Sequence, residues 1–155
     1  MAKAGYSIIT TADIALSAAT AKSVLGIRGN AAFGVDLIGI RFGFDGVSGS
    51  AEPVTIDLCY ATFATNAPGT NSTSRTPAQL YGRVLTHGFT GGSNWTAEPT
   101  VLTVIDSWLW HPQSGIIYDV PLGTSYDSAF SEGFVLRMTA PAAVNVNAGF
   151  KFERC

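Results

Sequence analysis

The sequence has little charge of either sign. Charged residues make up 13% of its 155 residues, about half the share found in an average soluble domain. Nine basic and eleven acidic residues give a net charge of −2, and no basic run supplies the clustered positive charge that nucleic-acid phosphates attract. This scarcity argues against a nucleic-acid partner. It favours surfaces of Thr, Ser, Asn, Ala and Gly, which suit contact with other protein subunits.

Long apolar runs are missing too. No stretch approaches the roughly 20 apolar residues of a membrane-spanning helix, so we expect no membrane partner. The N-terminal residues MAKAGYSIITTADIALSAATA imitate a signal peptide with an Ala-x-Ala end. Thr10, Thr11 and Asp13 interrupt its apolar centre, which argues against secretion.

Cysteine and histidine, which form most thiol and metal sites, are scarce. Cys59 lies in an apolar strand pattern and Cys155 ends the sequence, so we expect one buried thiol and one terminal thiol without a disulfide. His87 and His111 each close a strand-like run without a second ligand nearby, which is unlike a zinc site. We therefore expect no metal and no other cofactor.

The sequence also lacks a recognisable catalytic arrangement. Asp106 and His111 share a predicted strand with serines in reach, but no Gly-x-Ser-x-Gly or comparable nucleophile context accompanies them. A glycosidase needs two carboxylates roughly 5–10 Å apart, and only scattered acids are available for this role. They are Asp45, Glu52, Glu98 and Asp127. We expect that the protein is not an enzyme.

Alternation of apolar and polar residues is what the sequence has in abundance, and it predicts half-buried antiparallel strands. The clearest ranges are 36–44, 54–60, 134–139 and 144–153. Weaker patterns, rich in Val, Ile, Thr and aromatic residues, predict further strands. These are 21–28, 80–87, 101–111 and 116–120. About eight strands without helices between them indicate an all-β, antiparallel two-sheet β-sandwich of jelly-roll or other Greek-key type.

The strand pattern begins at residue 21, so residues 21–155 are expected to form a single β-sandwich domain. Residues 1–20 are expected to form an N-terminal arm, in which the Ala-rich stretch 11–21 fits a helix or an extended segment equally well. Two low-order stretches, 65–78 and 88–99, are long enough to be binding loops that project from one end of the sandwich.

The unit Ala-Glu-Pro occurs twice, each time directly before a predicted strand. Proline fixes φ and lacks an N–H, so it suits the first residue of a strand. This does not explain the two glutamates, Glu52 and Glu98. They could cap a loop N–H, pair with Arg41 or Arg83, or meet a neighbouring subunit, and we favour a structural or interface role over a catalytic one.

Three tryptophans are the remaining candidates for a site. Trp108 and Trp110 are two residues apart, so they share one face of a strand with Leu102 and Val104, and Trp95 lies in the polar loop before it. The core, a protein interface and a carbohydrate platform all suit such indoles. The candidate interface residues are therefore Glu52, Glu98, Trp95, Trp108 and Trp110.

Five phrases of the sequence stand in a characteristic order. They are AATAKSVLGIRG, RFGFDGVSGSAEPVTIDL, NWTAEPT, WHPQSG with YDVPLG, and LRMTAPAAVNVNAGFKFE. In this order they resemble a family of small tailed-bacteriophage virion proteins, the capsid decoration (auxiliary or cement) proteins with a β-sandwich domain. The resemblance covers roughly residues 18–153.

The resemblance implies a structural protein of the phage particle surface, made in the host cytoplasm. Such proteins bind an icosahedral shell in many copies, often as homotrimers, and stabilise it where capsomers meet without an active site. The implied partners are the major capsid protein and further copies of this chain, with the N-terminal arm contacting the shell or a neighbouring subunit. The alternative is a carbohydrate- or receptor-binding β-sandwich module, tail-fibre or lectin-like, that uses its tryptophans.

Overall fold

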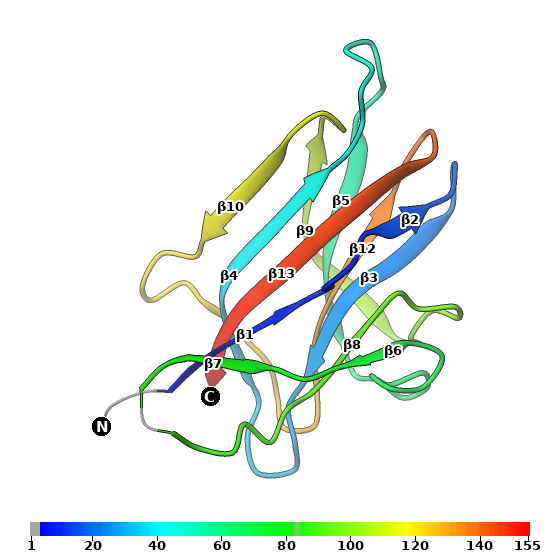
Figure 1. Cartoon of the computed structure of the whole chain (residues 1–155). Helices are drawn as coiled ribbons and strands as arrows, with labels where there is room; N and C mark the ends of the chain where they lie inside the picture. Colours follow the sequence, from blue (N-terminus) through cyan, green and yellow to red (C-terminus); the bar gives the residue numbers. More distant parts are fainter. Residues whose placement is uncertain (1–3, 83) are drawn as a thin grey trace.

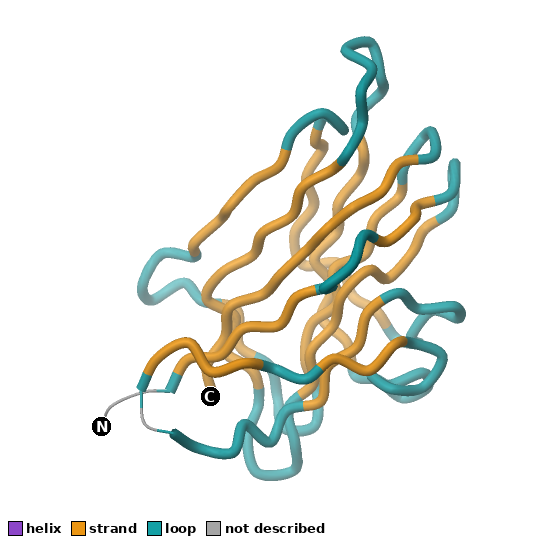
Figure 2. Tube along the Cα trace, viewed as in Figure 1, coloured by secondary structure: helices purple, strands orange, loops and turns teal. Residues whose placement is uncertain are grey.

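The chain forms two β-sheets packed face to face (Figures 1 and 2). The computed structural model describes residues 4–82 and 84–155, and these contain no helix. One sheet has seven strands and the other has six, and neighbouring strands in both sheets run antiparallel. The prediction of an all-β, antiparallel two-sheet sandwich is therefore confirmed.

The described residues form thirteen strands. In chain order they are β1 (Gly5–Ile9), β2 (Ile14–Leu16), β3 (Ala21–Arg28), β4 (Val35–Phe44), β5 (Val54–Ala61), β6 (Thr73–Arg75), β7 (Ala78–Tyr81), β8 (Thr90–Ser93), β9 (Leu102–Trp110), β10 (Gly115–Asp119), β11 (Tyr126–Asp127), β12 (Gly133–Thr139) and β13 (Val144–Arg154).

Eight of these strands have the connectivity of a jelly roll. The order β1-β13-β4-β10 runs through the seven-stranded sheet, and the order β3-β12-β5-β9 runs through the six-stranded sheet. Numbered one to eight along the chain, the two sheets read 1-8-3-6 and 2-7-4-5, the arrangement of two Greek keys folded into a sandwich. The total of thirteen exceeds the predicted eight because β2, β6, β7, β8 and β11 are additions of two to four residues.

Seven of the eight predicted strands belong to this framework, and β3 coincides with its prediction. The strand predicted over residues 80–87 is wrong in extent. β7 ends at Tyr81, Gly82 has a φ of 90°, and residues 84–89 form no strand. The eighth framework strand is β1, which is only five residues long and shows too little alternation to stand out.

The residues expected to form an N-terminal arm are part of the sandwich. β1 pairs with β13 on one side and with β7 on the other, and β2 pairs with the start of β13. Their inward side chains belong to the core and are at most 3% exposed. These side chains are Tyr6, Ile8, Ile14 and Leu16. Residues 4–20 therefore form neither a separate arm nor a helix, and residues 1–3 lie outside the described part of the chain.

The main core fills the space between the two sheets with inward-facing side chains from both. Fully buried members include Leu25, Leu37, Ile56, Leu58, Phe134, Phe150 and Phe152. Burial of each such large apolar side chain contributes roughly 1.5–3 kcal/mol. These contacts hold the sheets together and so fix the positions of the loops at the ends of the strands.

Both long polar stretches belong to one connection, residues 62–101, which runs from β5 to β9. This connection adds β6 and β8 to the edge of the six-stranded sheet and β7 to the edge of the seven-stranded sheet. It therefore lies along the sandwich for much of its length instead of projecting as two free loops.

Candidate functional site

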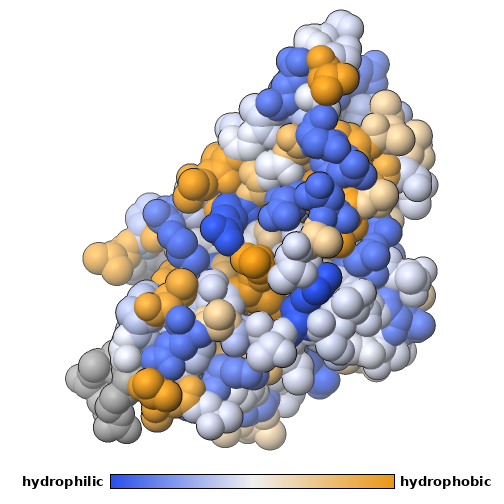
Figure 3. Space-filling view, viewed as in Figure 1, coloured by the Kyte–Doolittle hydropathy of each residue, from blue (hydrophilic) through white to orange (hydrophobic). Residues whose placement is uncertain are grey.

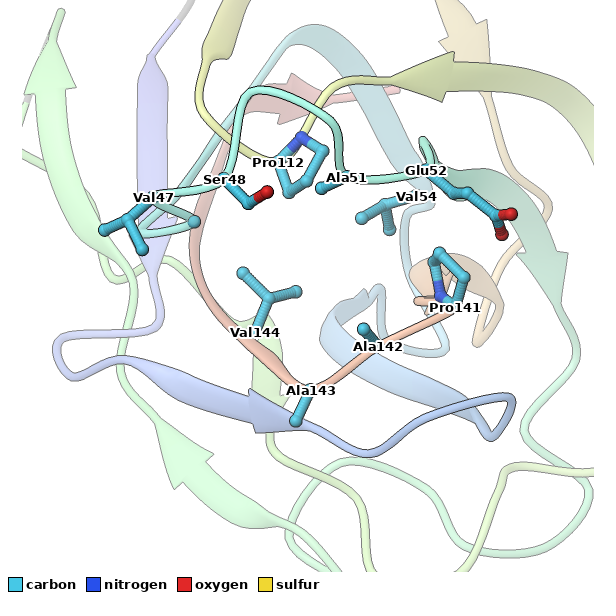
Figure 4. Close-up of a pocket in the computed structure, with 11 residues that line it drawn as sticks. Val47, Ser48, Ala51, Glu52, Val54, Pro112, Pro141, Ala142, Ala143 and Val144 are labelled. Carbon is cyan, nitrogen blue, oxygen red and sulfur yellow. The ribbon is translucent and has the colours of Figure 1, made fainter.

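An apolar hollow of about 310 Å³ opens at one end of the sandwich (Figure 4). We call it the end pocket. It lies between the β4–β5 loop (45–53), the β9–β10 turn (111–114) and the β12–β13 turn (140–143). Small apolar side chains form most of its walls. They are Val47, Ala51, Val54, Pro112, Pro141, Ala142, Ala143 and Val144, and Gly46, Ser48 and Glu52 complete the lining.

Hydrogen bonds connect the loops around the end pocket. The Asp45 carboxylate accepts bonds from the backbone N–H of Asn145 at 2.9 Å and from its side-chain amide at 2.8 Å. The N–H of Gly46 donates to the carbonyl of Pro112 at 2.8 Å, and the side-chain amide of Gln113 donates to the carbonyl of Val47 at 2.8 Å. The bonds from Asn145, the backbone bond first, lower the pKa of Asp45. The pocket walls are thus tied to one another.

Glu52 is the acidic group of the end pocket. Its side chain is exposed at the rim and points away from the apolar walls (Figure 4). It makes no hydrogen bond or ion pair with any described residue, so it neither caps a described loop N–H nor pairs with Arg41. Arg83, the other suggested partner, lies outside the described residues. The first Ala-Glu-Pro unit therefore offers a carboxylate to the exterior.

Glu98, in the second Ala-Glu-Pro unit, is a structural cap. Its carboxylate accepts bonds from the backbone N–H of Ser23 at 2.8 Å and from the Ser23 hydroxyl. Ser23 adjoins a β-bulge in β3, where Val24 is the extra residue opposite β12. A bulge leaves backbone groups unpaired, and the carboxylate supplies the acceptor that the neighbouring strand does not. Glu98 therefore caps a backbone N–H, but this N–H belongs to the bulged strand β3 and not to a loop as expected.

Trp95 is buried on the outer face of the six-stranded sheet and is only 2% exposed. Its Nε1 donates to the carbonyl of Asn66 at 2.8 Å. The ring lies over Gly26 and Gly92, which are directly opposite each other in β3 and β8. A Cβ at either glycine would lie within 2.9 Å of a ring carbon. Trp95 is thus the centre of a small second core and presents no indole to a partner.

Trp108 and Trp110 lie half-buried between the sheets, along the side where β9 and β10 are edge strands. The Trp110 ring meets Phe42 edge to face with centroids 6.2 Å apart, and the Trp108 ring tilts against Tyr118 at 6.3 Å. Both rings pack against the main core. They close this side of the sandwich and do not form an exposed platform.

A bulge in β9 separates these tryptophans from Leu102 and Val104. Asp106 lies opposite Leu58 and Val104 lies opposite Cys59, so Ile105 is the extra residue. Leu58 faces the main core and Cys59 faces the second core. The expectation that Leu102, Val104 and the two tryptophans share one face is therefore wrong, because one inserted residue reverses the alternation.

The remaining candidates for chemistry have local structural partners. Nδ1 of His87 accepts a bond from the N–H of Phe89 at 3.1 Å, and Nδ1 of His111 accepts one from Gln113 at 3.2 Å. Asp106 accepts a bond from the Tyr126 hydroxyl at 2.9 Å. Burial, and then this bond, raise the pKa of Tyr126 to about 12. Across residues 4–82 and 84–155, no three His, Cys, Asp or Glu side chains gather in a group that could hold a metal ion.

Cys59 is buried in the second core, where burial raises the pKa of its thiol to about 11. A thiol with such a pKa stays protonated at neutral pH and is a poor nucleophile. Neither described cysteine is in a disulfide, and Cys155 is exposed.

The five candidate interface residues do not form one site. Glu52 lies at the end pocket, Glu98 and Trp95 lie on the outer face of the six-stranded sheet, and Trp108 and Trp110 close one side. The pocket walls themselves were not predicted. Their signal is slight, because it consists of Val47 within a Gly/Ser-rich loop and of prolines and alanines at two turns.

The fold and the site define the chain as a jelly-roll β-sandwich with an apolar pocket at one end. No family model, no curated protein and no solved structure matches the chain. Nothing in the described part of the chain forms a helix long and apolar enough to cross a membrane.

Proposed function

We propose that this chain is a non-enzymatic structural protein of a tailed-phage particle, where it decorates and stabilises the capsid by binding at capsomer junctions. Its partners are the major capsid protein and further copies of itself, as a homotrimer in the form that the resemblance implies. It acts on the particle surface after synthesis in the host cytoplasm. The observation that supports this proposal most is the apolar end pocket on a charge-poor sandwich.

The end pocket supports a binding role because small apolar side chains line it and hydrogen bonds connect the loops that carry them. A concave apolar surface on a rigid scaffold suits burial of an apolar segment from a partner, with little ordering of the loops on binding. Decoration needs many identical weak contacts that act together on one shell, and multivalent attachment of this kind raises overall affinity without new chemistry.

The carbohydrate-binding alternative finds less support. A sugar platform needs exposed aromatic rings, whereas Trp95 is buried and the rings of Trp108 and Trp110 pack between the sheets. The indole Nε1 of Trp110 is itself buried without a hydrogen-bond acceptor among the described residues. We therefore favour protein recognition over glycan recognition.

The test is co-sedimentation of the purified chain with shells of the phage that encodes it. Ala142→Glu places a charge in the end pocket at an exposed turn position, so the fold should be kept. We expect the wild type to sediment with shells and this variant to bind at least tenfold more weakly. Ala129→Glu, at an exposed position outside the pocket lining, is the matched control and should bind like the wild type.

Failure of the wild-type chain to bind shells would contradict the proposal. Equal loss in both variants would show that the end pocket is not the contact. Binding of the wild-type chain to a glycan array in place of shells would move the assignment to a carbohydrate-binding module.

A further inference from the structure

The outer face of the seven-stranded sheet is unusually rich in glycine. Gly39 and Gly43 of β4, Gly115 of β10 and Gly149 of β13 all lie on it, on rows of paired residues that cross the three strands. Glycine weakens a strand, and within a sheet it often marks a place where another group approaches the backbone closely. We therefore ask, for each of these glycines, which group approaches the backbone at that position.

At three of the four glycines, the approaching group belongs to the chain itself. The ion pair between Lys151 and Asp119, 3.1 Å long, crosses Gly39, where a Cβ would lie 3.1–3.3 Å from both side chains. Arg41 lies across Gly149, where a Cβ would be 2.5 Å from its Nε. At Gly115 a Cβ would lie 2.5 Å from a backbone carbonyl oxygen. Side chains or backbone of the chain itself fill these positions.

At Gly43 no group of the described chain approaches the backbone in this way. A Cβ built on it would meet nothing within 4 Å, and its φ is not in the left-handed region. A β-branched residue would suit this strand position better than glycine does. The position is instead the floor of a shallow open hollow on the outer face, which we call the Gly43 hollow.

The rim of the Gly43 hollow carries groups without partners. Arg41, Asn147 and Ile117 line it, and Ile117 is 73% exposed. Neither the Arg41 guanidinium nor the Asn147 side chain hydrogen-bonds or pairs with a described residue. The other described arginines, 28, 75, 137 and 154, each bond an oxygen atom. The hollow thus offers a free cation beside an apolar wall.

The same chain carries a complementary feature. The β4–β5 loop projects beyond the strands at the end of the sandwich (Figures 1 and 2), and Figure 3 shows hydrophobic surface at its tip and over β10. Val47 in this loop is 92% exposed, and Glu52 is a free carboxylate. An apolar tip with a free anion matches an apolar hollow with a free cation. Within one chain the two features do not meet, since Arg41 and Glu52 form no ion pair.

We propose that the Gly43 hollow receives the β4–β5 loop of a second copy of this chain, with Glu52 of that copy bound to Arg41 and Val47 packed over Gly43. Glycine at position 43 lets the incoming loop reach the backbone of β4. Because one surface receives a different surface, the contact is heterologous, and such contacts close into rings when the rotation between copies permits.

This inference deepens the self-association that belongs to the proposed function and rests on it for its biological role. The proposed contact itself is between copies of the isolated chain and needs no shell. Self-association is therefore measured without shells, and shell binding is measured separately with the Ala142→Glu and Ala129→Glu variants, so that either idea can fail without the other.

The test is the solution mass by light scattering for the wild type and four charge variants. We expect a multiple of the 16.2 kDa chain mass for the wild type and about one chain mass for Arg41→Glu and for Glu52→Lys. The double variant Arg41→Glu/Glu52→Lys exchanges the two charges and should regain the wild-type mass. Asp127→Lys, a charge reversal at an exposed β11 position outside both surfaces, should leave the mass unchanged.

Gly43→Val tests the shape of the hollow. Its side chain enters open space, so the thermal midpoint should be unchanged or higher, while the loop is blocked and the mass falls to that of one chain. Thr55→Val, on the outer face of the other sheet, should not alter the mass. A monomeric wild type at about 100 µM, an oligomer that tolerates Gly43→Val, or a double variant that stays monomeric would each overturn the proposal.

Discussion

The two Ala-Glu-Pro units are the same in sequence and opposite in structural role. In the second unit Pro99 is buried and Glu98 is bonded to Ser23, whereas in the first unit Pro53 and Glu52 are both exposed. The first unit precedes β5 and the second unit precedes β9, and both are long strands. Pro53 directly precedes β5, whereas Thr100 and Val101, the latter with a φ of 59°, separate Pro99 from β9. Each glutamate takes its role from what the rest of the chain places beside it.

What stands beside the second unit is a bulge. Val24 bulges from β3, and the segment 94–98 supplies groups for the backbone around it. The N–H groups of Asn94 and Trp95 donate to the carbonyls of Val24 and Ser23, and Glu98 accepts the Ser23 N–H. The loop of the first unit projects from the end of the sandwich (Figure 1), and the Glu52 side chain bonds no described residue there. We conclude that the glutamate of the second unit stabilises the fold, whereas the glutamate of the first unit has no such role in the described chain.

The largest effect should come from removing the indole beside the second unit. Trp95→Ala leaves a cavity over Gly26 and Gly92 and should lower the free energy of unfolding by about 3–5 kcal/mol. Urea unfolding followed by circular dichroism measures this. Trp95→Phe keeps much of the ring volume and loses the bond to Asn66, so its loss should be clearly smaller. Equal losses would mean that the hydrogen bond, and not the packing, holds the segment.

A smaller effect is expected from Ser23→Ala. This change removes the hydroxyl that donates a hydrogen bond to the Glu98 carboxylate. The backbone N–H of residue 23 still donates to the same carboxylate. The free energy of unfolding should fall by about 1.5–3 kcal/mol, the usual net value of one hydrogen bond to a charged group. The same urea experiment measures it, and Ser50→Ala in the exposed loop of the first unit is the matched control, for which no measurable loss is expected.

In the loop that carries the first unit, we expect a mild loss of stability at acidic pH. The pKa of Asp45 is lowered in the folded chain by its bonds from Asn145, so the unfolded chain binds this proton more tightly. The resulting stability is present above the ordinary carboxyl pKa of about 4 and is lost as the pH falls through the lowered value. Thermal midpoints between pH 7 and pH 2 measure it.

Asp45→Asn provides the comparison for this pH dependence. The variant should be somewhat less stable at neutral pH, and the difference from the wild type should shrink as the pH falls below 4. A difference that stays constant with pH would show that the Asp45 carboxylate charge does not stabilise the end pocket.

The sequence predicted the fold well where alternation was long. Ranges such as 54–60 and 144–153 matched β5 and β13 because each strand has one face in the core and one face outside it. It missed β1, since a five-residue strand between two neighbours needs only Tyr6 and Ile8 to point inward. Alternation over so few residues does not separate a strand from a flexible segment.

The candidate site was less predictable because it depends on register and on loops. The bulge at Ile105 cannot be read from the pattern of β9, yet it decides which side chains face the core. Trp95 lies in a polar stretch, and its burial depends on Gly26 and Gly92 being opposite each other in different strands. The end pocket collects residues from three connections, and only the fold brings them together.

The most direct test of the division between the two units is to make the same substitution in both. Glu98→Gln and Glu52→Gln remove one negative charge each and keep the shape, and urea unfolding of the chain at low, monomeric concentration gives the two stabilities. We predict that Glu98→Gln lowers the free energy of unfolding by about 1.5–3 kcal/mol, as expected for a bond to a charged acceptor, while Glu52→Gln changes it by less than about 0.5 kcal/mol. Equal losses, or a larger loss for Glu52→Gln, would contradict the assignment of the second unit, and not the first, to folding.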